Sequence, residues 1–449
     1  MGNYTDFVDL SYTPHETDLI ASFKVGVPRW ENPLRAYGAV AAESSVGTWT
    51  KVEGSKYPHV KRIAAKVFSI ERGGWIKIAY PIENFEKGSI AQLLSSIAGN
   101  VFAMRAVTSL KLQDVSFPKE YVKAFKGPRL GLHGVKRLFH VKRPLLITVP
   151  KPKVGMTWKE HARIGYAAWT GGVDLLKDDE NLTNQAFNTF TKRVTESLKM
   201  RDKAERETGE KKSYLINITA PTLRELEKRA AFVADHGNEY AMLDIITSGW
   251  TAVQTLREIA QDYKLAIHAH RAMHAAFTRP KQHGMSMIMV AKLARLAGVD
   301  QLHIGTAGLG KMEGGQRLVL KLEEEITEKR VQEAEHETVH EHVQGMHVPE
   351  DPRMHTLSQD WYHIKPLIPV ASGGLHPLLL YGIFDSMGTD IAVQLGGGIH
   401  GHPKGTHAGA IAARSVIDAY MRDEPLEDVI KTIPEVRDAY EYWGLKRVR

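Results

Sequence analysis

A short stretch of the chain gathers residues that could bind a metal ion. The run Gly171-Gly-Val-Asp-Leu-Leu-Lys-Asp-Asp-Glu180 ends in Lys177, Asp179 and Glu180. In an extended segment, residues two apart share a face, so Lys177 and Asp179 point the same way and Glu180 can swing in from the next turn. Two carboxylates are few for Mg²⁺, which prefers six oxygen ligands and usually keeps water or substrate oxygens among them. A lysine carbamate would supply a third anionic oxygen, whereas an unmodified lysine would form salt bridges; the spacing alone leaves both open.

A glycine-rich run offers a second lysine. Gly305-Thr-Ala-Gly-Leu-Gly-Lys311 fits the phosphate-loop pattern of a glycine, four residues, a glycine and a lysine. Met312 stands where a serine or threonine should bind magnesium, which argues against a nucleotide site. The sequence therefore favours a mobile glycine loop that carries Lys311 over an active site.

A third motif resembles a zinc site. His336-Glu-Thr-Val-His340 matches the pattern in which two histidines one helical turn apart bind zinc and the glutamate activates water. His347 lies one place beyond the position of the third histidine of the extended motif, and Val343 replaces that motif's glycine. The surrounding segment, 323–351, is charged and poor in apolar residues, so it predicts a solvated helix and a loop on the outside of the protein.

The elements that must position these residues follow from the apolar pattern. From about residue 144, short apolar runs alternate with longer amphipathic segments, which indicates repeated β–α units and a parallel sheet. Eight repeats predict a closed (β/α)8 TIM barrel. The predicted strands are Leu145–Val149, Val173–Leu176, Tyr214–Ile218, Ala241–Ile246, Leu265–His268, Gln301–Ile304, Leu367–Val370 and Ile391–Leu395.

Polar or glycine-rich residues follow nearly every predicted strand, where a barrel places its chemistry. The glycine turns Ser372-Gly373-Gly374 and Gly396-Gly397-Gly398 could expose backbone N–H groups to a phosphate, although tight turns need no ligand. We expect all these residues to converge on one face. The others are Lys151, Lys153, Lys177 to Glu180, His268, His270, Arg271, His274 and Gly305 to Lys311.

The first third of the chain predicts a smaller α+β domain of the ferredoxin-like kind. Leu19–Val25 and Val60–Ile70 are rich in β-formers, and Asn84–Ala98 has helical spacing. We place the N-terminal domain at residues 1–138 and the barrel, with C-terminal helices over 405–449, at residues 139–449.

Composition limits the classes of protein. Of 449 residues, 43% are hydrophobic and 25% charged, as in an average soluble protein, and none is cysteine, which excludes disulfides and thiolate chemistry. No apolar run approaches the roughly 18 residues of a membrane helix, so we expect a cytoplasmic protein with no membrane partner. The charge of +7 is dispersed among acids, which disfavours nucleic acid and suits a small polyanion.

Seven motifs, in order along essentially the whole chain, resemble the large subunit of ribulose-1,5-bisphosphate carboxylase/oxygenase. Within that family, Val149 to Gly155, the glycine loop and Leu375-His-Pro377 resemble the archaeal form III enzymes. The seven motifs are Ala41 to Thr50, Ser96 to Asn100, Lys151-Pro-Lys153, Gly171 to Glu180, His270-Arg-Ala-Met-His274, Gly310-Lys-Met-Glu-Gly314 and Ser372-Gly-Gly374.

The resemblance implies a magnesium-dependent enzyme that enolises ribulose 1,5-bisphosphate and adds CO₂ to give two 3-phosphoglycerates, with O₂ as a competing substrate. Lys177, carbamylated by an activating CO₂, would bind Mg²⁺ with Asp179 and Glu180 and act as base. Carbamylation needs a neutral amine, so the pocket must lower the lysine pKa from about 10.4 or trap the product with metal. Lys151 would protonate the final carbanion, Lys311 would stabilise charge on the added CO₂, and His270 would transfer protons.

The resemblance also implies where the substrate binds. One phosphate would meet Thr48, Trp49, Lys311, Gly374, Gly396 and Gly397, and the other Arg271 and His303. Ser372 would contact a sugar hydroxyl, and Lys153, Gly373, Glu43 and Asn100 complete the set. In the family, the N-terminal domain that carries Glu43, Thr48, Trp49 and Asn100 completes the neighbour's barrel. A homodimer or an assembly of dimers is therefore implied, without a small subunit.

The nearest rival is a carboxylase-like enolase or isomerase on the same fold that fixes no CO₂. Such relatives usually replace several substrate-contacting residues. This chain keeps Thr48, Asn100, Lys151, Arg271, His303, Lys311 and Ser372. The form III resemblance suggests a role in nucleoside-monophosphate salvage, and a phosphoribulokinase elsewhere in the genome would suggest a photosynthesis-like cycle instead.

Overall fold

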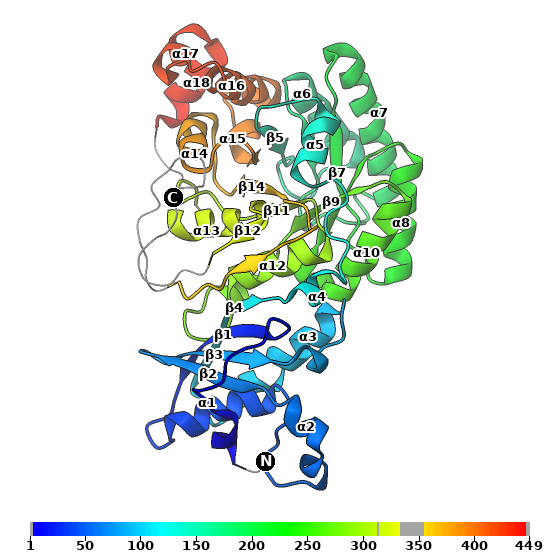
Figure 1. Cartoon of the computed structure of the whole chain (residues 1–449). Coiled ribbons are helices and arrows are strands. Elements are labelled where there is room, and N and C mark those ends of the chain that lie inside the picture. The colour runs from blue at the N-terminus through cyan, green and yellow to red at the C-terminus, as the bar shows by residue number, and fades with distance from the viewer. Residues whose placement is uncertain (1–2, 312–313, 333–353, 446–449) are drawn as a thin grey trace.

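The computed structural model describes residues 3–311, 314–332 and 354–445 (Figure 1). The smaller N-terminal part has the element order β-α-β-β-α-β, as predicted for a ferredoxin-like domain. Its sheet has the order β10-β4-β1-β3-β2, in which β10, from the barrel region, pairs parallel to β4. The elements are β1 (Leu19–Gly26), α1 (Pro33–Glu43), α2 (Pro58–Arg62), β2 (Lys66–Glu71), β3 (Trp75–Tyr80), α3 (Ile90–Ile97), β4 (Ser109–Ser116) and β10 (Gly284–Met285).

Local sequence sets the helix starts in this part. Asn32 caps α1 by accepting the Leu34 N–H, with Pro33 in the first helical position, and Ser89 caps α3 by accepting the Gln92 N–H. The predicted strand over Val60–Ile70 is only half right, because Pro58 opens the short helix α2 and the strand begins at Lys66.

The second part is the predicted barrel. Eight parallel strands close in the order β11-β14-β15-β5-β6-β7-β8-β9, so every predicted strand is confirmed to within two residues at its ends. They are β5 (Leu145–Thr148), β6 (Leu175–Lys177), β7 (Ser213–Asn217), β8 (Tyr240–Asp244), β9 (Ala266–His270), β11 (Gln301–His303), β14 (Ile368–Ser372) and β15 (Ala392–Leu395).

Helices surround the strands (Figure 1). Thr157 and Glu160 form a capping box at the start of α6, and Thr222 and Ser286 cap α8 and α12. The helices are α4 (Lys119–Val122), α5 (Gly131–Phe139), α6 (Trp158–Thr170), α7 (Phe190–Thr208), α8 (Leu223–Asp235), α9 (Ile245–Ser248), α10 (Trp250–Asp262), α11 (Ala275–Thr278), α12 (Met287–Ala297), α13 (Gln316–Thr327), α14 (Leu380–Met387), α15 (Gly397–His400), α16 (Gly405–Tyr420), α17 (Leu426–Thr432) and α18 (Pro434–Trp443). A small two-stranded antiparallel sheet pairs β12 (Arg330–Val331) with β13 (Gln359–Asp360).

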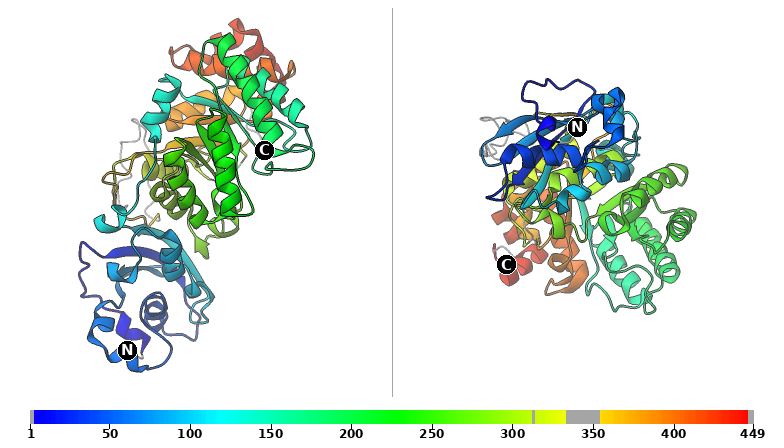
Figure 2. Two further views of the ribbon diagram at one scale, coloured as in Figure 1. Left: turned by 90° about the vertical axis from the view of Figure 1, so that its right-hand side faces the viewer. Right: turned by 90° about the horizontal axis from the view of Figure 1, so that it is seen from below.

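The barrel interior is filled at its amino-terminal end. Leu132, Val135 and Phe139 of α5 belong to one buried cluster with strand residues such as Ile147 and Met242, so α5 plugs this end. Chemistry is thereby confined to the carboxyl ends of the strands. The two views of Figure 2 place the N-terminal sheet at one end of the molecule and α17 and α18 toward the other. The division at residues 138 and 139 stays a prediction.

One exterior prediction is wrong. The segment from Glu323 was expected to be solvated, but its first residues belong to α13, where Glu323 and Glu325 are 3% and 0% exposed. The cause is a distant partner, because Lys292 of α12 approaches Glu325 to 3.6 Å. His336, His340 and His347 lie outside the described residues. No described helix is long and apolar enough to cross a membrane.

Candidate active site at the carboxyl ends of the barrel strands

Lys177 is the last residue of β6 and is fully buried. Its Nζ donates to the Asp178 carbonyl oxygen at 2.8 Å and lies 4.0 Å from Glu180 Oε2. Burial lowers the pKa of Lys177, because an ammonium loses its hydration in the interior. The pocket therefore favours the neutral amine that a carbamate requires.

Asp179 is held beside a lysine from the neighbouring strand. Lys151, which follows β5, places Nζ 2.9 Å from Asp179 Oδ2, and the Asn181 side chain donates to Oδ1 at 2.8 Å. Burial opposes ionisation, but these hydrogen bonds hold the pKa of Asp179 below its ordinary value. Lys153 lies two residues further along and is exposed.

This donor set fits magnesium only if a further oxygen is added. Among the described residues, no group of three or more histidine, cysteine, aspartate or glutamate side chains is arranged to hold a metal ion. Asp179 and Glu180 supply carboxylate oxygens, which a hard cation prefers. Lys177 Nζ lies 4.0 Å from Glu180 Oε2, so a carbamate there would bring oxygens to the same place.

His270 links the end of β6 to the opposite strands. Its Nε2 lies 3.6 Å from Glu180 Oε2, and its Nδ1 lies 3.1 Å from Asp244 Oδ1. Its ring centroid is 5.0 Å from that of His303, whose Nδ1 is 2.6 Å from Ser372 Oγ. Arg271 follows on the same rim, and burial lowers its pKa to about 10, so it remains a cation near neutral pH.

Lys311 is docked on the turn after β14. Its backbone N–H donates to the Gly373 carbonyl oxygen at 2.9 Å. A Cβ on Gly374, where φ is +77°, would come within 2.8 Å of Lys311 Cγ, so only glycine fits there. On the next strand, a Cβ on Gly396 would stand 3.0 Å from Lys151 Cε, and Gly397 follows in α15. The predicted glycine turns and three of the predicted lysines thus share one rim.

Four predicted residues lie elsewhere within this chain. Glu43 ends α1, Thr48 and Trp49 follow it, and Asn100 opens a short 3-10 helix; Trp49 is 82% exposed. In the part of the chain that the structure describes, no hydrogen bond or ion pair joins them to the barrel residues. Figure 1 shows α1 on the far side of the N-terminal sheet from the barrel. A single chain does not bring them to its own site.

The sequence analysis gave no role of its own to Asp178, and it missed Asp244. Asp178 is fully buried, accepts hydrogen bonds from Tyr214 Oη and, at 3.0 Å, from the Asn217 N–H, and lies 3.2 Å from Arg193 Nε. It anchors the backbone between Lys177 and Asp179. Asp244 was a detectable signal, since it is the only charged residue in the apolar run Ala241–Ile246.

Comparison with known proteins decides the family. Residues 132–443 match the model described as the ribulose bisphosphate carboxylase large chain, catalytic domain, and residues 6–121 match that of the N-terminal domain. The chain belongs to the ribulose bisphosphate carboxylase large-chain family. The resemblance to this family that the sequence predicted is therefore confirmed.

Relatives in this family match over nearly the whole chain. The ribulose bisphosphate carboxylases of Methanocaldococcus jannaschii and Pyrococcus abyssi are both 46% identical, over 98% of this chain and 100% and 97% of theirs. Among solved structures, the dimeric archaeal Rubisco of Hyperthermus butylicus has a TM-score of 0.90 at 44% identity, covering 99% of this chain and 100% of that one. Octameric Rubisco of Pyrococcus horikoshii gives 0.88 at 44% identity, covering 99% of each chain.

Proposed function

We propose that the chain is a ribulose-1,5-bisphosphate carboxylase/oxygenase of the archaeal form III kind, which converts ribulose 1,5-bisphosphate and CO₂ to two 3-phosphoglycerates. The observation that carries the proposal is that residues predicted for the site meet in four pairs on one rim of the barrel. They are Lys151 with Asp179 at 2.9 Å, Glu180 with His270 at 3.6 Å, His303 with Ser372 at 2.6 Å, and Lys311 with Gly373 at 2.9 Å.

In this proposal, Lys177, carbamylated by CO₂, joins Asp179 and Glu180 as ligands of Mg²⁺. When bound, Mg²⁺ supplies Lewis-acid stabilisation of the negative charge that develops on substrate oxygens. The burial of Lys177, which lowers its pKa, and the Glu180 carboxylate beside it support this assignment. In the proposal, the carbamate of Lys177 is also the base that removes the C3 proton.

The other polar residues divide the remaining proton transfers and the charge. Lys311, at the edge of the rim, neutralises charge on the newly added carboxyl group. Lys151 protonates the final carbanion, and its ion pair with Asp179 keeps it oriented over the site. His270 moves protons during hydration and cleavage, with Asp244 fixing its ring.

Two phosphates need two groups of donors. Arg271 and His303 bind one phosphate, and Ser372 accepts a hydrogen bond from a sugar hydroxyl. Lys311, Gly374, Gly396 and Gly397 begin the second phosphate site, with Lys153 and Gly373 beside them. We assign the rest of that site, Glu43, Thr48, Trp49 and Asn100, to a partner subunit. The dimeric and octameric relatives, and the lack of any hydrogen bond or ion pair between these four residues and the barrel rim among the described residues, support a homodimer or an assembly of dimers.

We further propose that O₂ competes with CO₂ at this site, that the enzyme acts in the cytoplasm, and that it serves nucleoside-monophosphate salvage. The archaeal relatives support the form III assignment on which the last of these rests.

One assay tests the carboxylase. The full-length protein is activated with Mg²⁺ and bicarbonate and then given ribulose bisphosphate and labelled CO₂. We expect labelled 3-phosphoglycerate, lost on treatment with a chelator and restored by Mg²⁺. Consumption of the sugar without label in the product would instead identify an enolase or isomerase, and activity restored by zinc alone would identify a zinc enzyme.

A further inference from the structure

A line of three hydrogen bonds leads from the barrel interior to Ser372. His268 Nδ1 lies 2.8 Å from Gln301 Oε1, and His268 Nε2 lies 2.9 Å from His303 Nε2. The last bond joins His303 Nδ1 to Ser372 Oγ at 2.6 Å. Gln301 and His268 are fully buried, and His303 is 3% exposed. Water therefore cannot take the place of either partner in these bonds.

The direction of this line follows from its buried end. The Gln301 amide turns Nε2 toward Tyr240 Oη at 3.2 Å, which leaves its oxygen, an acceptor only, against His268 Nδ1. His268 must therefore carry its proton on Nδ1. A neutral imidazole has one donor and one acceptor, so His268 Nε2 accepts from His303 Nε2. His303 Nδ1 is then an acceptor, and the Ser372 hydroxyl must donate to it.

Both rings hold a single proton. Burial lowers the pKa of His268 and of His303 well below the ordinary value, and the neighbouring His268 lowers that of His303 further. The 2.9 Å separation of their facing Nε2 atoms agrees with this, because only one of these two nitrogens can carry a proton.

We propose that Gln301 and His268 are positioning residues that fix the Ser372 hydroxyl as a hydrogen-bond acceptor toward the substrate. With its proton committed to His303, Ser372 presents only lone pairs to the site. It then selects a ligand that donates a hydroxyl at this point and disfavours one with hydrogen or a pure acceptor there. This specificity rests on the proposed function, which places a sugar hydroxyl on Ser372.

Neutron diffraction from crystals of the full-length protein, exchanged into D₂O near neutral pD, locates the exchangeable protons of His268, His303 and Ser372 directly. We expect deuterium on Nδ1 of His268, on Nε2 of His303, and on Ser372 Oγ directed at His303. Deuterium on Nε2 of His268 and Nδ1 of His303 would overturn the proposal. The measurement needs no turnover, so it remains decisive even if the protein proves not to be a carboxylase.

A binding experiment tests the consequence. Ribulose bisphosphate and analogues that each lack one hydroxyl are titrated into wild type, Gln301→Leu and Ser372→Ala, with Gln261→Leu, at an exposed end of α10, as control. One hydrogen bond corresponds to a preference of about fivefold to tenfold for the hydroxyl at this position. We expect Gln301→Leu to lose most of this preference for the hydroxyl and Ser372→Ala to lose all of it. Gln261→Leu should keep the full preference. Full preference in a folded Gln301→Leu would refute the positioning role.

Discussion

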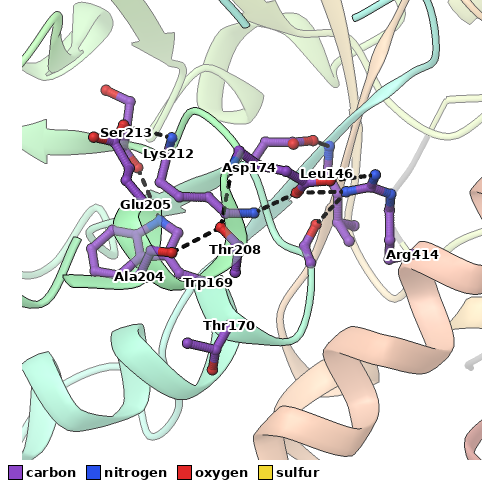
Figure 3. A network of polar contacts seen from close by, with 12 residues as sticks. Leu146, Trp169, Thr170, Asp174, Ala204, Glu205, Thr208, Lys212, Ser213 and Arg414 are labelled. Atoms are coloured by element: carbon purple, nitrogen blue, oxygen red, sulfur yellow. Dashed lines mark hydrogen bonds and ion pairs between the residues drawn. The ribbon is translucent and has the colours of Figure 1, made fainter. Parts of the chain in front are cut away.

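The two ends of strand β6 carry charge in different ways. At the amino-terminal end, the Asp174 carboxylate accepts two hydrogen bonds of 2.7 Å from the Arg143 guanidinium and one of 2.8 Å from the Leu146 N–H. Arg414 lies close by (Figure 3). At the carboxyl end, Lys177 Nζ donates to one backbone oxygen at 2.8 Å and has its nearest Glu180 oxygen at 4.0 Å. Both ends are buried.

The difference separates stability from chemistry within one strand. The charge of the Asp174 carboxylate is balanced by Arg143, and its oxygens accept hydrogen bonds. It therefore links the start of β6 to β5 and to the loop between α5 and β5. Burial destabilises the charged form of Lys177, although carboxylates lie nearby, and this leaves its amine available for reaction. In this fold, chemistry takes place at the carboxyl ends of the strands, which is where the buried amine of Lys177 lies.

Removing the amine should have the largest effect. We expect Lys177→Met to lower carboxylation at least about 10³-fold, since in the proposed mechanism it removes the base and a metal ligand together. Its stability should be unchanged or higher, because a buried apolar chain carries no desolvation cost. Product formation and thermal unfolding are measured side by side. Substantial activity in the folded variant would refute the role of Lys177.

The opposite end should respond in the opposite sense. Asp174→Asn leaves the buried Arg143 with only the more distant Asp418, 3.8 Å from its Nε, which should lower the free energy of unfolding by about 3 kcal/mol. Activity per folded molecule at 25 °C should remain close to wild type. Asp428→Asn, at an exposed position, is the matched control and should change neither quantity. If Asp174→Asn lost activity but not stability, the assignment of stability to one end of β6 and chemistry to the other would be wrong.

A smaller effect should appear in the pH dependence near Asp174. Glu210 contacts Arg414 at 2.8 Å and Lys212 at 2.8 Å, and although burial opposes it, these partners lower its pKa from 4.5 to about 2. Its contribution to stability is therefore complete above about pH 4.5 and is lost as the pH falls toward 2. Because Glu210 is partly exposed, this contribution should be only about 0.5–1 kcal/mol.

Urea unfolding of wild type and Glu210→Gln, at one protein concentration, measures this term. The difference in unfolding free energy should be present at neutral pH and shrink at about pH 3. A difference that grows on acidification would show that the sign is wrong.

The sequence predicted the barrel because each strand is an apolar run buried on both faces, and predicted the rim because polar residues follow those runs. It could not predict which side chains of different strands and helices face each other. Gln301 begins an apolar run and was not recognised, because its role depends on the register that sets it against His268. Glu325 was expected in solvent because its partner Lys292 lies on another helix. The two-residue strand β10 is too short to leave a periodic signal.

The uptake of carbon dioxide by Lys177 is the most direct point to measure. The full-length protein is incubated with carbon-13-labelled bicarbonate and Mg²⁺, and its carbon-13 NMR spectrum is compared with that of Lys177→Met. We predict a carbamate resonance in the wild type that is missing from the variant. A resonance of equal intensity in Lys177→Met, or its absence from a preparation that forms labelled 3-phosphoglycerate, would contradict the assignment of Lys177 as the carbamate.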